Sequence, residues 1–552
     1  MKQYQLRLHG LSLSITEAEQ EMTLLKEKAA AALGLPPSAL LCLKLNRKSL
    51  DSRDKQDLRF VYALDVTCTA KSMPKSRKRG ITADPIADKP LPQVEQGSEA
   101  LLHPPVVVGA GPAGLFAALI LAEAGYKPLL IERGPAVPQR AADVEHFWST
   151  GSLNEESNVQ FGEGGAGTFS DGKLTSRGKD PLAKLVFDSF IEAGADPEIG
   201  YWYKPHIGSD RLQVVIPALR RRIIALGGRI AFNAKLTDVT LDSSGAVEAV
   251  TVNDTLILPT QTLVLALGNG ARDSYRMLLQ RGFTFAAKPF AVGFRIDHPQ
   301  ALIDTAQHGD FAPLLPAADY QLTWQDKENG RGYYSFCMCP GGHIVNASSQ
   351  AGMLVVNGVS YAKRDSGRAC SAIVGTVNPG RDFADTPEAA LAWQEELEQR
   401  AYALGGGDYA LPVQLAEDFI NGVVTDAADA RLQGFDPKAA AWRCVDLNGL
   451  LPDGLNDGLK AALQHWQRVI PQFIGQGVLA GVESRTSAPV RMPRDESGQA
   501  LAHPGCYPAG EGAGYAGGIV SSAVDGIRAA QALMRRFATP QTDFAEMPPL
   551  SD

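Results

Sequence analysis

The sequence of 552 residues predicts an α/β fold, built around a parallel sheet whose strands come from two distant segments of the chain. Three observations predict it. A glycine-rich strand–loop–helix–strand pattern covers Val106–Gly134, and a second glycine-rich strand–loop–helix begins at Gly505. In the first 70 residues, apolar and polar residues alternate as expected for the strands of a separate small unit. With 45% hydrophobic residues, the chain can bury two or three cores.

Residues 1–70 are expected to form a small α+β domain. A βαββ order indicates a ferredoxin-like arrangement. Residues 71–104 have the composition of a linker, and the basic run Lys75–Gly80 within it is expected to be solvated, because the net charge of the whole chain is −8. The predicted elements are strands at Gln3–Leu8, Leu40–Leu45 and Leu58–Val66, and a helix at Thr16–Leu33 with Thr16 as its N-cap.

The strand Val106–Val108 ends in a glycine-rich turn with the spacing of a dinucleotide-binding βαβ unit. Gly109 is expected to make the tight turn, Gly111 to let the backbone approach a pyrophosphate, and Gly114 to let the helix pack on the strand. The positive end of the helix would face the phosphates. Glu132, 18 positions after Gly114, would accept hydrogen bonds from ribose hydroxyls. Pro112, Ala113 and Arg133 complete the binding residues predicted here.

The segment Gly505–Gly526 indicates that the dinucleotide is FAD. A short strand, Gly510-Glu511, a glycine loop and a new helix follow one another, as in two-part flavoprotein folds where the late segment holds the ribityl chain and the flavin ring. Glu511 is expected to accept a ribityl hydroxyl. The helix start at Gly517-Gly518-Ile519 would direct N–H groups toward the O2/N1 edge of the flavin. The alternative is a capping turn on an amphipathic C-terminal helix.

Five motifs resemble the bacterial FAD-dependent oxidoreductases called NAD(FAD)-utilising dehydrogenases, and the similarity extends over nearly the whole chain. This resemblance implies FAD as the cofactor and NADH or NADPH as a transient electron donor. Two of the motifs are common to flavoproteins, FGEGGAGTFSDGKL (Phe161–Leu174) and the terminal GEGAGYAGG. Three are specific to the family, KPFAVGFRIDHPQ (Lys288–Gln300), YYSFCMCPGGHIVNASSQ (Tyr333–Gln350) and GVESRTSAPVRMPRD (Gly481–Asp495).

Other segments are expected to contact the cofactor as well. The loop Phe161–Lys173 is so rich in glycine that its backbone must approach a partner closely, and we expect Gly164, Gly165 and Thr168 to do so, although a flexible surface loop is the alternative. Ala234 and Leu236 are predicted beside the adenine, and Gly268 follows the buried strand Thr262–Leu267. Gly268-x-Gly270 lacks the third glycine of a second dinucleotide motif. NAD(P)H would therefore dock transiently in the substrate cleft.

Cys337 and Cys339 are candidate redox residues. On an extended segment, two side chains two positions apart point to opposite faces, which disfavours a local disulfide. Two cysteines also supply only half of a zinc site, so no metal is expected. Three interpretations stay open: cysteines buried in the core, a thiol facing the flavin, or a redox pair.

Arg485 and Arg491 are candidates for orienting the substrate. Guanidinium groups hold carboxylate or phosphate groups with two hydrogen bonds, so an anionic substrate or a nucleotide phosphate could bind here. The alternative is internal ion pairing with Asp495, Glu496 or Glu511.

Together these patterns predict an FAD-dependent oxidoreductase that moves two electrons through the flavin N5, with NAD(P)H as donor and a small, unidentified organic substrate. Two alternatives stay open, a flavin-dependent reductase acting on RNA bases and a protein in which FAD is only structural. The predicted segments are a Rossmann-like FAD-binding domain in two parts, 105–287 and 481–538, an inserted mixed α/β substrate domain, 288–480, and a loose tail, 539–552.

The composition indicates where in the cell the chain acts and which classes of partner it can bind. Seven scattered cysteines do not form a disulfide framework, and the first residues lack the apolar core of a signal peptide. We therefore expect a soluble cytoplasmic protein with no membrane partner. The mildly acidic balance also disfavours nucleic acid as a partner.

Overall fold

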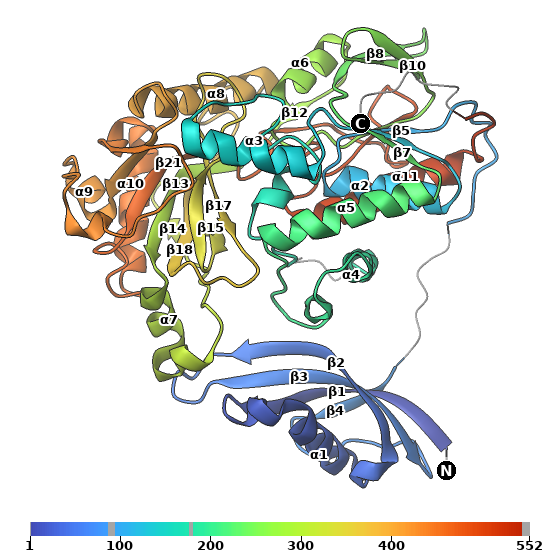
Figure 1. The fold of residues 1–552 in the computed structure, drawn as a ribbon, viewed down its shortest axis with the longest axis vertical. Helices are drawn as coiled ribbons and strands as arrows, with labels where there is room; N and C mark the ends of the chain where they lie inside the picture. The colour runs from blue at the N-terminus through green and yellow to red at the C-terminus, as the bar shows by residue number, and fades with distance from the viewer. Residues whose placement is uncertain (1, 87–93, 176–179, 544–552) are drawn as a thin grey trace.

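A computed structural model describes residues 2–86, 94–175 and 180–543 (Figure 1). Residues 87–93 of the predicted linker and 544–552 of the predicted tail lie outside the described residues. The described chain forms a parallel-sheet domain, an inserted domain with a large antiparallel sheet, and a small N-terminal domain at the bottom of Figure 1. The predicted α/β fold with a Rossmann-like domain is confirmed.

The parallel sheet has the strand order β23-β11-β5-β6-β7. The strand from the far end of the chain, β23, pairs in parallel with β11, which in turn pairs with β5. Two segments separated by hundreds of residues therefore build one sheet. The strands are β5 (Val106–Val108), β6 (Leu129–Ile131), β7 (Arg229–Ala231), β11 (Leu263–Leu265) and β23 (Cys506–Pro508).

Helices cover one face of this sheet, and Val107, Leu130 and Val264 pack against them. The other face lies under a three-stranded antiparallel sheet. The helices are α2 (Pro112–Glu123), α4 (Leu182–Glu192), α5 (Ser209–Ala225) and α11 (Ile519–Arg536), with α3 (Val137–Thr150) and α6 (Arg272–Gln280) nearer the inserted domain. The antiparallel strands are β8 (Leu236–Leu241), β9 (Val247–Val252) and β10 (Leu256–Pro259).

The inserted domain contains a seven-stranded sheet in the order β14-β15-β18-β13-β21-β19-β20. Strand β21 ends at Glu483, so this sheet extends past the predicted boundary at residue 480. The strands are β13 (Phe290–Pro299), β14 (Thr323–Asp326), β15 (Arg331–Cys339), β18 (Arg368–Val377), β19 (Leu411–Leu415), β20 (Trp442–Cys444) and β21 (Val478–Glu483). The pairs β16 (Gly342–Asn346) with β17 (Val356–Ser360) and β12 (Ala286–Ala287) with β22 (Val490–Arg491), and the helices α7 (Gln300–His308), α8 (Pro387–Leu404), α9 (Ala416–Asn421) and α10 (Asp453–Trp466), complete this region.

The N-terminal domain is a four-stranded antiparallel sheet in the order β2-β3-β1-β4, with α1 on one face. The fourth strand comes from the predicted linker, so that prediction is wrong for β4. The predicted N-cap is also wrong, because Ser14 and Glu17 exchange hydrogen bonds as a capping box, at 3.2 and 2.8 Å, and α1 follows a 3-10 turn. The elements are β1 (Lys2–Ser14), α1 (Glu21–Leu33), β2 (Leu40–Asp51), β3 (Arg59–Ala70) and β4 (Thr82–Pro85).

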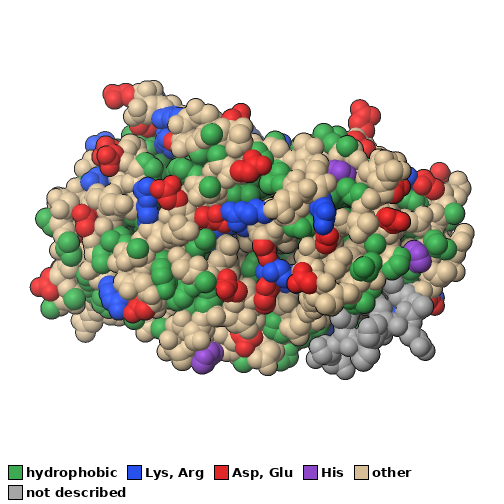
Figure 2. All heavy atoms as spheres, turned by 90° about the horizontal axis from the view of Figure 1, so that it is seen from above, with side chains coloured by type: hydrophobic (Ala, Val, Ile, Leu, Met, Phe, Trp, Pro, Cys, Tyr) green, Lys and Arg blue, Asp and Glu red, His purple; other side chains and the backbone are tan. Residues whose placement is uncertain are grey.

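Charges of both signs are interspersed on the molecular face seen in Figure 2. Neither sign forms a continuous block there, which agrees with the small net charge of −8. Among the described residues, no helix combines the length and the apolar character needed to cross a membrane.

Candidate functional site

A cavity of about 1770 Å³ lies where the parallel sheet meets the inserted sheet. The carboxyl ends of β5, β6 and β11 open onto it, which is where ligands bind in open α/β sheets. Residues of the glycine-rich loop, of β15 and of the C-terminal return complete its wall. A pocket for one small molecule encloses roughly 300–1,000 Å³. This cavity is larger, and its lining extends from Glu132 at the end of β6 to β14 and β15.

The three glycines after β5 divide into packing and approach positions. A Cβ on Gly109 would lie 2.3 Å from the Ala266 oxygen, and one on Gly114 would lie 1.8 Å from the Gly109 oxygen. Backbone atoms therefore leave no space for a side chain at these two positions. Gly111 lines the cavity, and a Cβ there would meet only the Gly165 Cα at 3.9 Å. Helix α2 starts directly after Gly111, so its free N–H groups and open backbone fit a diphosphate.

Glu132 fastens three loops at the end of β6. One carboxylate oxygen accepts the Ala110 N–H at 2.7 Å, and the other accepts the N–H groups of Gly134 and Gly162, both at 3.0 Å. The side chain is buried but lines the cavity. Its place at the strand end suits a ribose, and the contact with ribose hydroxyls stays a prediction.

Arg140 is a buried support that the sequence analysis missed. Its guanidinium is fully buried and donates only to backbone carbonyls, and burial lowers its pKa to about 10. An arginine on an amphipathic helix is usually solvated, so the pattern of α3 gave no signal for this role. The accepting carbonyls are those of Asn158, Val159, Gly162, Glu163 and Gly165, at 2.7 to 3.3 Å. Arg140 thereby fixes the path of the glycine-rich loop.

Of the three cofactor contacts predicted in that loop, Gly165 lines the cavity. Gly164 and Thr168 are absent from the described residues of its wall, and their contact with the cofactor stays a prediction. The Gly164 N–H donates to the Ala110 oxygen at 2.8 Å, and the Thr168 hydroxyl donates to the Glu163 oxygen at 3.3 Å. Both hydrogen bonds lie within the protein, so these two groups stabilise the conformation of the loop.

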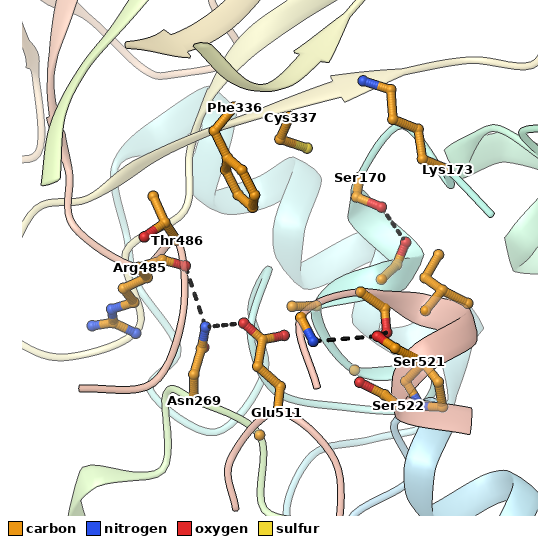
Figure 3. A pocket seen from close by; sticks show the side chains of 18 of the residues that line it. Ser170, Lys173, Asn269, Phe336, Cys337, Arg485, Thr486, Glu511, Ser521 and Ser522 are labelled. Atoms are coloured by element: carbon orange, nitrogen blue, oxygen red, sulfur yellow. Dashed lines mark hydrogen bonds between the residues drawn. The ribbon is translucent and has the colours of Figure 1, made fainter. Parts of the chain in front are cut away.

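Glu511, predicted for the flavin end, lies between Asn269 on one side and Ser521 and Ser522 on the other (Figure 3). Asn269, which the sequence analysis did not select, donates to the Glu511 carboxyl at 2.8 Å and to the Arg485 carbonyl at 3.2 Å. Burial raises the pKa of Glu511 to about 7. The group can therefore hold or release a proton near neutral pH at the cavity wall.

The glycines around Glu511 leave space for a ligand at two positions and pack tightly at a third. A Cβ on Gly268 or Gly517 would meet no atom within 4 Å, and both residues line the cavity. Gly510 instead packs on α2, where a Cβ would lie 2.8 Å from the Ala113 Cβ, and it does not reach the described wall. The Gly517 N–H donates to the Ser521 hydroxyl at 3.2 Å. Pro112, Ala113, Gly518 and Ile519 also line the cavity.

The residues predicted near the adenine also line the cavity. Ala234 and Leu236 line the cavity, as does Arg133. The Arg133 guanidinium lies over the Phe161 ring at 4.0 Å from its centroid and pairs with Glu156 and Asp273 at 2.6 and 2.9 Å. Arg133 is thus held rigidly, although the adenine contact itself stays a prediction.

Cys337 and Cys339 differ in their surroundings. Cys337 has a φ of 44° at a β-bulge in β15, so the extended path assumed for this segment is wrong. The bulge aims Cys337 at the cavity, whereas Cys339 is completely buried. A hydrogen bond to the Cys339 thiol, together with burial, raises the pKa of Cys337 well above its usual range. Cys337 is therefore a neutral thiol at neutral pH, and Cys339 has no place on the described wall.

The two arginines predicted to grip an anion are placed differently from the expectation. Arg485 lines the cavity, but its guanidinium is buried against Glu398 at 2.7 Å, and Arg272 binds the same carboxylate at 2.6 Å. Arg491 is exposed beside Tyr515 and is absent from the described wall. The expected partners Asp495, Glu496 and Glu511 are wrong as well. All three Arg485 guanidinium nitrogens donate inside the protein, to Glu398, Ser349 and Gln350.

Two known families match parts of the chain. Residues 289–486 match the family described as "FAD-dependent protein, C-terminal domain-like", and residues 107–162 match "NAD(P)-binding Rossmann-like domain". The second match covers the βαβ unit that ends in Glu132. Residues 2–67 match a domain of unknown function.

An "Uncharacterized protein" of Clostridium beijerinckii is 42% identical over 542 residues, covering 97% of this chain and all of that protein. Among solved structures, glycine oxidase from Geobacillus kaustophilus is similar at 12% identity and a TM-score of 0.33, covering 82% of this chain and 98% of that chain. L-amino acid deaminase from Proteus vulgaris is similar at 11% identity and a TM-score of 0.34, covering 82% and 94%. These scores are too low to indicate the reaction of this chain.

Proposed function

We propose that this chain, which belongs to one family with the Clostridium beijerinckii protein and carries an FAD-dependent C-terminal domain, transfers two electrons between NADH or NADPH and a small organic substrate. The observation that carries this proposal is the size of the cavity. The cavity extends past the residues predicted to hold FAD to Trp324 of β14 and Phe336 of β15, and this further space would admit a second molecule. The resemblance to NAD(FAD)-utilising dehydrogenases supports a nicotinamide as the donor.

The residues of the cavity divide the work between holding the cofactor and binding the second molecule. Gly111 and the start of α2 would hold the diphosphate, Glu132 the ribose, and the region of Gly268 and Gly517 the flavin end. Bound FAD would supply two-electron chemistry at its N5 atom. Glu511 would hold a proton at its carboxyl, where the Asn269 amide fixes its position.

A second dinucleotide motif does not follow a strand elsewhere in the sequence. The donor would therefore enter the same open space as the substrate and leave before the substrate binds. Aromatic side chains of β14 and β15, among them Trp324 and Phe336, line this part of the cavity. They offer flat apolar surface to a nicotinamide ring or to a ring of the substrate.

The test is anaerobic mixing of the purified yellow protein with NADH or with NADPH, following the flavin absorption band. We expect one of the two nucleotides to bleach the flavin within seconds. Dithionite serves as the control that the bound flavin can be reduced. If dithionite bleaches the flavin while both nucleotides fail, the NAD(P)H-linked function is wrong.

A further inference from the structure

We propose that Lys173 binds the carboxylate of the substrate, and that the substrate is an organic acid with an apolar body about the size of one ring. This inference deepens the proposed function and rests on it. Lys173 ends the glycine-rich loop and lines the cavity. Figure 3 shows its side chain across the cavity from Glu511, next to Cys337 of β15.

The backbone around Lys173 is fixed from both sides. The Leu174 N–H donates to the Pro205 oxygen at 2.9 Å, and the Ile207 N–H donates to the Gly172 oxygen at 3.0 Å. Lys173 and His206 form an isolated β-bridge between these bonds. These contacts fix the position of the Lys173 Cα at the cavity wall.

The charges around Lys173 do not cancel. Asp171 is the carboxylate beside it, and Asp171 is already paired with Arg364 at 2.6 Å and hydrogen-bonded to the Ser360 hydroxyl. Burial lowers the pKa of His206, so that ring is neutral at pH 7. Two cations, Lys173 and Arg364, therefore face one anion. Within the described part of the chain, no ion pair or hydrogen bond joins the Lys173 ammonium to another residue.

An excess positive charge in a buried part of the wall carries a desolvation free-energy cost unless an anion compensates it. Burial opposes the charge on Lys173, but Asp171 raises its pKa above the usual value, so the ammonium stays protonated. Other described cations of the wall have bonded partners or face solvent. Arg485 donates to Glu398, Ser349 and Gln350, Lys204 is paired with Asp319, and Lys327 is exposed to solvent. Among the described residues, Lys173 is therefore a wall cation that a ligand can neutralise.

The surface next to Lys173 is apolar. The Phe336 ring points into the cavity above Glu511, and Cys337, which lies between Phe336 and Lys173 in Figure 3, faces the cavity as a neutral thiol. Met338 follows on the same strand and lines the wall. A carboxylate on the ammonium would bring an apolar ring onto this surface. The geometry therefore fits a small aromatic or cyclic carboxylate better than a hydrophilic acid.

The test titrates the FAD-loaded protein with benzoate and with benzamide, its uncharged counterpart of nearly the same shape, following the flavin absorption spectrum. We expect benzoate to bind at least about tenfold more tightly than benzamide, because one charge-assisted hydrogen bond is at stake. Lys173→Met should abolish this preference, and Lys173→Arg should restore part of it. Lys184→Met is the matched control, since Lys184 is a solvent-exposed lysine paired with Asp188.

Two results would overturn the inference. In one, wild type binds benzoate no better than benzamide, or Lys173→Met keeps the preference. In the other, Lys173→Met loses FAD, which would make Lys173 a cofactor-binding residue. Reduction by NADH or NADPH is measured on the same samples. If the wild-type protein binds benzoate more tightly than benzamide but neither nucleotide bleaches its flavin, NAD(P)H is not the donor. The proposed anion site would still stand.

Discussion

The Asn269 amide donates to the Glu511 carboxyl at 2.8 Å, and this bond joins the two segments of the parallel-sheet domain at the cavity wall. Asn269 follows β11, whereas Glu511 follows β23, its neighbour in the sheet. The same amide nitrogen donates to the Arg485 carbonyl, which belongs to the chain leaving the inserted domain. One side chain thus fixes the junction of all three segments.

This relationship predicts a pH-dependent stability. Burial raises the pKa of Glu511 from 4.5 to about 7, so the folded chain keeps a proton that the unfolded chain has released. The stability from this group is complete below pH 4.5 and is lost as the pH rises through 7. Glu511→Gln, freed of FAD, should match wild type at pH 5 and exceed it by up to about 3 kcal/mol at pH 8 in urea unfolding. A difference that stays constant with pH would contradict this.

Two glycines three residues apart should respond differently to the same substitution. Gly111→Ala places a methyl group in the cavity, so FAD affinity should fall at least about tenfold while the fold is kept. Gly114→Ala would force a Cβ to within 1.8 Å of the Gly109 oxygen, so α2 must shift and the protein should lose thermal stability as well. Flavin-to-protein absorbance ratios and circular dichroism melting curves separate the two. Equal melting losses would argue against the division between packing and approach positions.

Arg140 should matter for FAD although it lies behind the cavity wall. Arg140→Met leaves five buried carbonyls without their donor, and the expected loss of unfolding free energy is at least about 3 kcal/mol. The loop would relax, so the bound fraction of FAD should fall too. Arg221→Met, a substitution of an exposed arginine on α5, is the control. Unchanged melting and full FAD occupancy in Arg140→Met would rule out this supporting role.

The Arg485–Glu398 pair should act on stability. Glu398→Gln leaves two buried guanidinium groups without their carboxylate, and breaking such a buried pair costs about 3–5 kcal/mol. We expect both Glu398→Gln and Arg485→Met to lower the melting temperature, and Arg485→Met to lower it less, because Arg272 still pairs with Glu398. A normal melting temperature in Arg485→Met, combined with weaker benzoate binding, would return Arg485 to the anion-binding role first predicted for it.

The parallel-sheet core and most of its contacts could be predicted because they rest on local patterns. Gly109 and Gly114 have packing needs that only glycine meets, Gly111 keeps the cavity open for a ligand, and Glu132 stands at the end of a recognisable strand. The role of the C-terminal glycine segment could be predicted from its local pattern in the same way. Glu511 therefore lies at the wall of the cavity where its motif predicted a binding site.

The rest of the site depends on distant pairings that a single sequence does not reveal. Arg485 has the sequence context of an anion-binding residue, yet its guanidinium binds Glu398 of α8, 87 positions away in the chain. Lys173 shows the reverse case, an ordinary lysine at the end of a loop whose charge remains uncompensated after folding. The left-handed conformation of Cys337 also arises from a bulge against β18, which periodicity cannot predict.

The measurement that tests the central claim most directly is the identity and amount of the nucleotide released when the purified protein is heat-denatured. Chromatography separates FAD, FMN and NAD(P), and absorbance gives the amount per chain. We expect FAD, close to one molecule per chain, in wild type, and much less in Gly111→Ala. Release of FMN or NAD(P) in place of FAD, or failure of the nucleotide-free protein to take up added FAD, would contradict the assignment of this cavity.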